Sequence, residues 1–212
     1  AACGLTDGRI QIFDIAKKKK IAEWQAHKQD EFVNSLCFLP DGNFLLSGGN
    51  DREVHLWAFK TGFFSKKLKS KRKMTNKAAN DSIRSVSVNA DASIALCTEK
   101  SSLLWDLNTG KTAGKVRIPR GHYPSFSCLS PDAEYMIQNS EIWNCSDNKE
   151  VSFVKGESET KCACFSSDGK WLITGDSKGG INIWNFEDYI SEGASLEIKP
   201  VIVPNQIKIS FI

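Results

Sequence analysis

The chain has 212 residues, enough for one large domain or two small ones, and 41% of them are hydrophobic. This much apolar material supports a packed core, which excludes a disordered chain. No apolar run reaches the roughly 18 residues of a membrane-spanning helix, and the first residues do not read as a secretory leader. Seven cysteines without framework spacing favour free thiols in a reducing intracellular compartment, with cytoplasm and nucleus not distinguished.

The net charge of +3 is unevenly distributed along the sequence. Residues 60–77 contain eight basic residues and no acidic one. In the remainder of the chain, acidic residues outnumber basic ones. The chain is therefore a mildly acidic body with one basic segment, which excludes a globally basic nucleic-acid binder.

A repeated pattern organises the chain from its start. Five short alternating segments each carry an aromatic residue near their end, and the spacings between these aromatics are 44, 48, 38 and 41 residues. The aromatic residues are Phe13, Trp57, Trp105, Trp143 and Trp184. A second column of turn residues precedes four of them, at Asp41, Asp91, Asp132 and Asp168. Two columns that keep one period predict a structural repeat of about 40 to 45 residues.

Each repeat is predicted to consist of short β-strands. In the unit before Trp57, the segments 33–38, 44–47 and 53–59 are rich in β-branched and aromatic residues and are bounded by Gly, Asp or Asn. No segment shows a sustained helical period, so an all-β chain is expected. Four strands per repeat of this length are typical of a blade in a β-propeller.

At these residues the chain resembles the WD-repeat β-propellers. Trp105-Asp106 matches the dipeptide for which the family is named, Phe13-Asp14 is a close variant, and Trp57-Ala58 departs from it. Gly121-His122 stands where the family places a Gly-His pair. The repeat-defining residues are Phe13, Asp14, Trp57, Trp105, Asp106, His122, Trp143 and Trp184. The fold that this resemblance implies hosts many functions and identifies none.

The resemblance also implies a buried hydrogen-bonded set of four side chains. One unit has a candidate for every member: His27, Ser47, Asp51 and Trp57. A buried indole N–H, imidazole and hydroxyl each need a partner, and a carboxylate would orient the imidazole. The other units are expected to be incomplete. Glu99 replaces the carboxylate before Trp105, and Lys178 replaces it before Trp184.

The strands predicted along the chain add up to about five blades. The expected units are 1–31, 32–81, 82–122, 123–159 and 160–206, with the start of a further unit at 207–212 and a basic inter-blade insertion at 64–81. Both ends fall inside a unit and no initiator Met is present. We therefore expect a part of a larger ring of seven or eight blades. The alternatives are a closed five-blade ring, in which 207–211 pairs with the first strand, and a ring completed by another chain.

The sequence offers no constellation for catalysis or for a cofactor. With three histidines, no Ser–His–acid or Cys–His set can be assembled, and no cysteines and histidines have the spacing of metal ligands. The Gly-containing segments are strand-to-strand turns and not phosphate-binding loops. We therefore predict no enzyme activity, no metal, no cofactor and no small-molecule substrate.

Two surfaces are candidate binding sites. Loops that enter the inner strands share one rim of a propeller, and exposed aromatic and Arg residues there suit a protein hot spot. The rim candidates are Phe32, Arg52, Arg84 and Tyr123. The basic segment could bind nucleic acid or another anionic surface through phosphate contacts, because few aromatics interleave with it. Its candidates are Lys66, Lys67, Lys69, Lys71, Arg72 and Lys73.

The sequence thus predicts a non-catalytic scaffold that binds other proteins within a multi-protein assembly. The first alternative is a ribonucleoprotein assembly factor that binds nucleic acid through residues 66–73. The second alternative is a regulatory or sensor propeller whose activity lies outside these residues.

Overall fold

The computed structural model describes residues 1–58, 70–75, 81–116, 124–154 and 158–191, with the backbone alone described for residues 70–75, 153, 189 and 191. Its strands form five antiparallel sheets in chain order. The first sheet contains β1 (Ala2–Gly4), β2 (Arg9–Asp14) and β3 (Lys19–Gln25). The second contains β4 (Val33–Phe38), β5 (Phe44–Gly49), β6 (Glu53–Ala58) and β7 (Ser70–Thr75).

The remaining sheets repeat this order. The third sheet contains β8 (Ser85–Val88), β9 (Ile94–Thr98), β10 (Ser102–Asp106) and β11 (Thr112–Val116). The fourth contains β12 (Ser127–Leu129), β13 (Tyr135–Gln138), β14 (Glu141–Asn144) and β15 (Glu150–Phe153). The fifth contains β16 (Thr160–Phe165), β17 (Trp171–Asp176) and β18 (Ile181–Asn185). Each strand pairs with the next one along the chain inside its sheet, which is the connectivity of a propeller blade.

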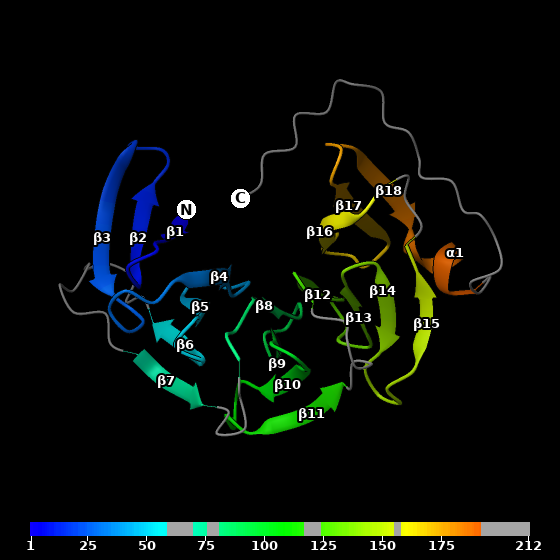
Figure 1. Ribbon diagram of the computed structural model, residues 1–212, viewed down its shortest axis with the longest axis horizontal. Helices are drawn as coiled ribbons and strands as arrows, with labels where there is room; N and C mark the ends of the chain where they lie inside the picture. The colour runs from blue at the N-terminus through cyan, green and yellow to red at the C-terminus, as the bar shows by residue number, and fades with distance from the viewer. Residues whose placement is uncertain (59–69, 76–80, 117–123, 155–157, 192–212) are drawn as a thin grey trace.

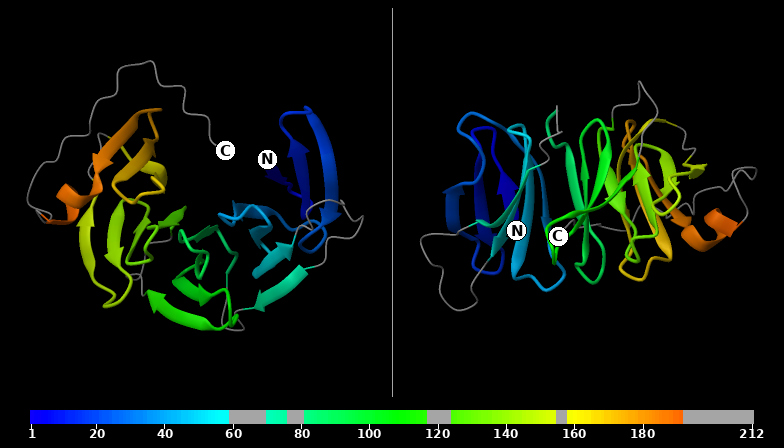
Figure 2. Two further views of the ribbon diagram at one scale, coloured as in Figure 1. Left: turned by 180° about the vertical axis from the view of Figure 1, so that it is seen from behind. Right: turned by 90° about the horizontal axis from the view of Figure 1, so that it is seen from below.

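The five sheets stand side by side around a common centre (Figure 1). The inner strands β4, β8, β12 and β16 contact one another in turn, and β1 contacts β4. The arc is open between the first and the fifth sheet, as the view from behind also shows (Figure 2). The prediction of an antiparallel β-propeller that forms part of a larger ring is confirmed.

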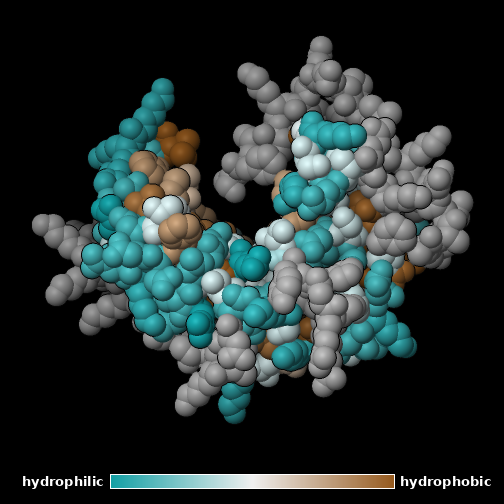
Figure 3. Space-filling model, in the orientation of Figure 1, coloured by the Kyte–Doolittle hydropathy of each residue, from teal (hydrophilic) through white to brown (hydrophobic). Residues whose placement is uncertain are grey.

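The hydrophobic core lies between neighbouring sheets. We call the side of a sheet that packs on the next sheet along the chain its forward face, and the opposite side its backward face. Ile10 and Ile12 on the forward face of the first sheet pack with Leu45 and Trp57 on the backward face of the second. Viewed along the axis of the arc, the surface of the described residues is largely hydrophilic, with hydrophobic residues between the sheets (Figure 3).

A short helix, α1 (Phe186–Ser191), follows β18 and was not predicted from the sequence. Its first residue packs edge-on against Tyr135 and Phe165, with ring centroids 5.5 and 4.9 Å apart. Six residues are too few to show a helical period, and tertiary contacts hold this turn of helix in place. The strand predicted at 207–211 lies outside the described residues. No helix among the described residues is long and apolar enough to cross a bilayer.

The residue that follows the aromatic of the internal repeat has a local structural role. Asp14, Asp106 and Asn144 each end a third strand, and their side-chain oxygens accept hydrogen bonds from backbone N–H groups two or three residues later. In each case the residue four positions later has a positive φ, at Lys18 (50°), Gly110 (71°) and Asn148 (59°). The Asp or Asn of the repeat therefore fixes the turn into the outer strand, as expected for Asx turns.

Replacing Lys18 with glycine should raise the free energy of unfolding by about 0.5–1 kcal/mol, because glycine adopts a positive φ without strain. Gly110 already fills the equivalent position in the third sheet. Chemical denaturation measures the change. The control is Lys19→Gly at the start of β3, which should destabilise. Equal destabilisation by both variants would contradict this explanation of the turn.

Candidate functional site

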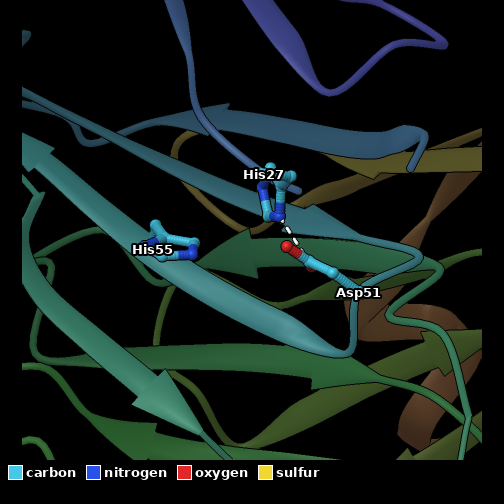
Figure 4. A group of neighbouring side chains, drawn as sticks. All are labelled: His27, Asp51 and His55. Carbon is cyan, nitrogen blue, oxygen red and sulfur yellow. Dashed lines mark hydrogen bonds and ion pairs between the residues drawn. The ribbon is translucent and has the colours of Figure 1, made fainter. Parts of the chain in front are cut away.

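A buried hydrogen-bonded network joins the first and second sheets beneath one rim of the arc. His27 lies just after β3, Ser47 on β5, Asp51 in the turn after β5, and Trp57 on β6. His27 Nδ1 lies 2.8 Å from Asp51 Oδ1 (Figure 4). Its Nε2 lies 2.8 Å from Ser47 Oγ. The indole N–H of Trp57 donates to Ser47 Oγ at 2.9 Å. The structure therefore brings together all four side chains singled out in the sequence.

The carboxylate of Asp51 also holds the backbone of the rim. Its Oδ2 accepts the backbone N–H of Lys28 at 3.0 Å, and its Oδ1 accepts that of Glu53 at 3.2 Å. The side chains of Asp51 and His27 are fully buried. Burial alone would raise the pKa of Asp51, but its hydrogen bond to His27, the charge of His27 and the two backbone donors outweigh it and lower this pKa. Asp51 thus fixes the imidazole and the loops on both sides of the seam.

An aromatic cluster that the sequence did not predict as a unit surrounds this network. His55 stacks on Trp57 with ring centroids 5.1 Å apart, and its edge meets His27 at 5.0 Å. Trp24 of β3 packs edge-on against Trp57 at 5.5 Å. Glu53 Oε2 lies 3.0 Å from His55 Nε2, while burial lowers the pKa of His55. The sequence placed His55 and Trp57 on one face of a strand but gave no signal for Trp24 or Glu53.

Three of these side chains also carry atoms that can bind a metal ion. Ligand atoms of His27, Asp51 and His55 all lie within 4.8 Å of one another. Both ring nitrogens of His27 are engaged, however, and the 2.8 Å to Asp51 is a hydrogen-bond distance. Two ligands about 2.0–2.1 Å from one tetrahedral zinc would lie farther apart than this. The arrangement therefore fits a hydrogen-bonded network better than a metal site.

The position of Ser47 is filled differently in the other sheets. Strand register aligns Ser47, which faces His55, with Cys97, Gln138 and Thr174, which face Leu103, Glu141 and Asn182. Thr174 Oγ1 accepts the indole N–H of Trp184 at 3.0 Å, as Ser47 does for Trp57.

Cys97 offers no hydroxyl at this position, and among the described residues the indole N–H of Trp105 has no hydrogen-bond partner. The hydroxyl of Ser102, on the neighbouring sheet, instead donates to Gln138 Oε1 at 2.8 Å. The first and second sheets are therefore joined through a Ser–His–Asp network, whereas hydrogen bonds among Thr98, Ser102, Ser127 and Gln138 join the third and fourth.

The predicted rim residues lie in loops of the second and third sheets, with Phe32 just before β4, Arg52 in the turn before β6 and Arg84 just before β8. Phe32 is 49% exposed, and Arg52 and Arg84 are exposed. The N–H of Asn50 donates to the carbonyl of Phe32 at 2.9 Å, and Asn34 Nδ2 lies within 2.9 Å of both Asn50 Oδ1 and the carbonyl of Ile83. Hydrogen bonds thus connect the backbone from Phe32 to the residue before Arg84. The fourth rim candidate, Tyr123, lies outside the described residues.

The structure describes little of the predicted basic surface. Residues 70–75 form β7, the outer strand of the second sheet, which pairs with β6. Lys71, Arg72 and Lys73 are on this strand, and their side chains are not among those described. Lys66, Lys67 and Lys69 lie outside the described residues, as does His122 of the repeat-defining set.

Comparison with known protein families supports the fold. A family model described as "WD domain, G-beta repeat" matches residues 18–58 and 148–185. The first match contains the whole network of His27, Ser47, Asp51 and Trp57. The predicted resemblance to WD-repeat β-propellers is confirmed.

Similar sequences occur in long proteins of several kinds. The chain is 22% identical over 193 residues to apoptotic protease-activating factor 1 of Rattus norvegicus, aligning 88% of this chain with 15% of that protein. It is 27% identical over 194 residues to autophagy-related protein 16 of Arabidopsis thaliana, aligning 82% of this chain with 36% of that protein. For protein groucho of Drosophila melanogaster the identity is 21% over 186 residues, and the aligned shares are 83% and 24%. The chain spans about a third or less of these relatives.

A solved structure has the same fold. A chain in the crystal structure of the mitotic checkpoint complex superposes with a TM-score of 0.68 at 21% identity. The superposition covers 87% of this chain and 60% of that one.

Replacing Asp51 with asparagine should lower the free energy of unfolding by about 2–3 kcal/mol at pH 7, because a charge-assisted buried hydrogen bond is lost. The folded-state pKa of Asp51 is lowered, so its contribution is present above about pH 4 and is lost as the pH falls through the folded pKa. The difference between wild type and D51N should therefore shrink below about pH 4. Urea denaturation at several pH values measures it. Asp41→Asn in an exposed turn is the control, and an equal effect of both variants would refute a special role for Asp51.

Cys97→Ser should raise the free energy of unfolding by about 0.5–1 kcal/mol, because it gives the indole N–H of Trp105 an acceptor. The converse variant, Thr174→Val, removes the acceptor of Trp184 without changing volume and should destabilise by about 1–2 kcal/mol. Thermal or chemical denaturation compares the two. A destabilising Cys97→Ser would mean that burying the hydroxyl costs more than the new hydrogen bond contributes.

Proposed function

We propose that this WD-repeat chain is a non-catalytic scaffold that holds another protein on the rim carrying Phe32, Arg52 and Arg84. The observation that carries the proposal is a set of exposed side chains on a backbone fixed from below. The carboxylate of Asp51 accepts backbone hydrogen bonds from both the loop before β4 and the turn before β6, and both of these segments carry rim residues.

The chemistry of the rim suits protein recognition. Phe32 exposes about half of its surface, and Arg52 projects from a turn in which it adopts a φ of 67°. Aromatic and Arg side chains are enriched in hot spots, where a preorganised backbone reduces the entropy lost on binding. Arg52 has no ion pair within the described part of the chain, so its guanidinium is available to a carboxylate of a partner.

The relatives are consistent with this proposal without identifying the partner. A chain with this fold is part of the mitotic checkpoint complex, which is a multi-protein assembly. Because the chain spans a minor part of its relatives, their partners and activities are not transferred to it.

The second candidate function is binding of a polyanion through residues 66–73. The observation that favours it is the local density of charge, because eight basic residues and no acidic one occur in residues 60–77. Such a segment would bind phosphates with a steep dependence on salt. The rim proposal is preferred because Phe32, Arg52 and Arg84 are exposed, which supports their availability to a partner.

The double variant Phe32→Ala, Arg52→Ala should reduce capture of bound proteins at least about tenfold, since hot-spot truncations typically cost more than 1 kcal/mol each. The matched control is Ile15→Ala, Lys17→Ala in the β2–β3 turn on the opposite rim, which should leave capture unchanged. Affinity purification with quantitative mass spectrometry, with and without nuclease, provides the readout. Unchanged capture by the rim variant would reject the rim, and loss of capture on nuclease treatment would favour the basic segment.

A further inference from the structure

The three described rim residues meet at the turn between β5 and β6. Arg52 belongs to this turn, and the N–H of Asn50 in the same turn donates to the carbonyl of Phe32 at 2.9 Å. Arg84 comes from the third sheet, and the residue before it donates its backbone N–H to this turn. One turn therefore connects side chains that two different sheets contribute.

A single carbonyl group holds the two arginines near each other. The carbonyl of Gly49 accepts the N–H of Arg52 at 3.2 Å and the N–H of Ile83 at 3.1 Å. The two nitrogen atoms are therefore at most roughly 6 Å apart, and Ile83 directly precedes Arg84. Because an arginine side chain is long, both guanidinium groups can reach the same short segment of a partner.

Two further features fix this arrangement. Asn34 Nδ2 donates to Asn50 Oδ1 at 2.8 Å and to the carbonyl of Ile83 at 2.9 Å, so it bridges the turn and the third sheet. A Cβ on Gly49 would lie 2.5 Å from His27 Nδ1, so the turn rests directly on the buried network. The backbone positions of the two arginines are thus preorganised, which reduces the entropy lost when a ligand binds both.

The positive charge of the two arginines is not balanced within the described part of the chain. Neither Arg52 nor Arg84 forms an ion pair there. Arg84 does interact with Asp81 electrostatically, but more weakly than the N–H of Ser82 and Lys100 do. The carboxylates of this region have other partners: Asp51 pairs with His27, Glu53 with His55, and Asp81 with Lys100. Two like charges held close together without a counter-charge favour an anionic ligand.

The surroundings favour carboxylates of a protein over the backbone of a nucleic acid. Asp30 and Glu31 directly precede Phe32, and Asp81 lies three residues before Arg84. A continuous row of phosphates would pass these acidic side chains, and such a row is bound by a row of cations. Phe32, which is 49% exposed, offers an apolar contact beside the two charges.

We infer that the rim binds a short acidic segment of a partner protein, whose carboxylates contact Arg52 and Arg84 and whose neighbouring apolar residue packs on Phe32. The planar guanidinium group suits this ligand, because it can pair with a carboxylate through two parallel hydrogen bonds. The inference rests on the proposed rim function and adds the chemistry of the partner.

The test selects ligands for the full-length protein from a display library of short random peptides. Peptides that bind the wild type but not Phe32→Ala should be enriched in Asp and Glu at least about threefold over the starting library. On the variant Arg84→Glu, this enrichment should disappear and basic residues should replace acidic ones. The matched control is Lys111→Glu, which makes the same change of charge at an exposed residue of the β10–β11 turn on the opposite rim. It should select the same acidic peptides as the wild type.

The best acidic peptide, synthesised with a fluorophore, tests both arginines together. Arg52→Ala and Arg84→Ala should each weaken its binding at least about fivefold. Replacing its acidic residues with Asn and Gln should remove most of the effect of both variants, because the interaction that they delete is then already lost. An unchanged melting temperature shows that the variants are folded.

Three results would overturn the inference. Peptides that depend on Phe32 but are not acidic would leave the rim function standing and refute only the chemistry inferred for the partner. If no selected peptide depends on Phe32, the inference is wrong, and the capture experiment with Phe32→Ala, Arg52→Ala decides separately whether the rim function also fails. Binding of single-stranded RNA that Arg84→Glu abolishes and Lys111→Glu retains would identify nucleic acid as the occupant.

Discussion

Face-to-face packing of neighbouring sheets is the interaction on which the rest of this structure depends. A four-stranded sheet has two apolar sides and cannot bury both alone, so each sheet here is completed by its neighbours. Trp57, Trp105, Trp143 and Trp184 all lie on backward faces, and each packs on aliphatic residues of the preceding sheet. Because an indole carries an N–H into this core, each interface also needs a hydrogen-bond acceptor for that group.

The indole N–H has a hydrogen-bond acceptor in some of these interfaces and lacks one in others, and this difference affects the loops at the rim. Between the first and second sheets, the hydroxyl of Ser47, the imidazole of His27 and the carboxylate of Asp51 form one chain of hydrogen bonds that ends on the backbone of the rim. Between the second and third sheets, Cys97 takes the place of Ser47. Its thiol does not accept the indole N–H of Trp105, so the equivalent series of hydrogen bonds does not form. The loops that carry Phe32 and Arg52 are both hydrogen-bonded to Asp51, which supports the proposal that this part of the rim is a docking surface.

Much of this fold was accessible from the sequence because its signals are local and repeated. The columns of aromatic and turn residues predicted the strands, and the resemblance placed His27, Ser47, Asp51 and Trp57 together. The equivalents of Ser47 were harder to find, because turns of different length separate the second and third strands. Ser47 and Thr174 precede their tryptophans by ten residues, whereas Cys97 precedes Trp105 by eight. Only the strand register identifies Cys97, since a fixed offset points to Ala95.

Other features depend on contacts that no sequence pattern carries. Helix α1 is held by rings from two different sheets, and Trp24 joins the network from a strand where nothing marks it. These are tertiary properties.

Hydrogen exchange at the rim of the full-length protein tests most directly the central claim that the buried network holds the rim rigid. The N–H groups of Lys28 and Glu53 bond to Asp51, and that of Asn50 bonds to the carbonyl of Phe32. The account predicts that these three amides are protected as strongly as those in the centre of β5. Exchange at the rate of an unstructured peptide, with β5 still protected, would show that the rim moves independently of the network and would contradict the account.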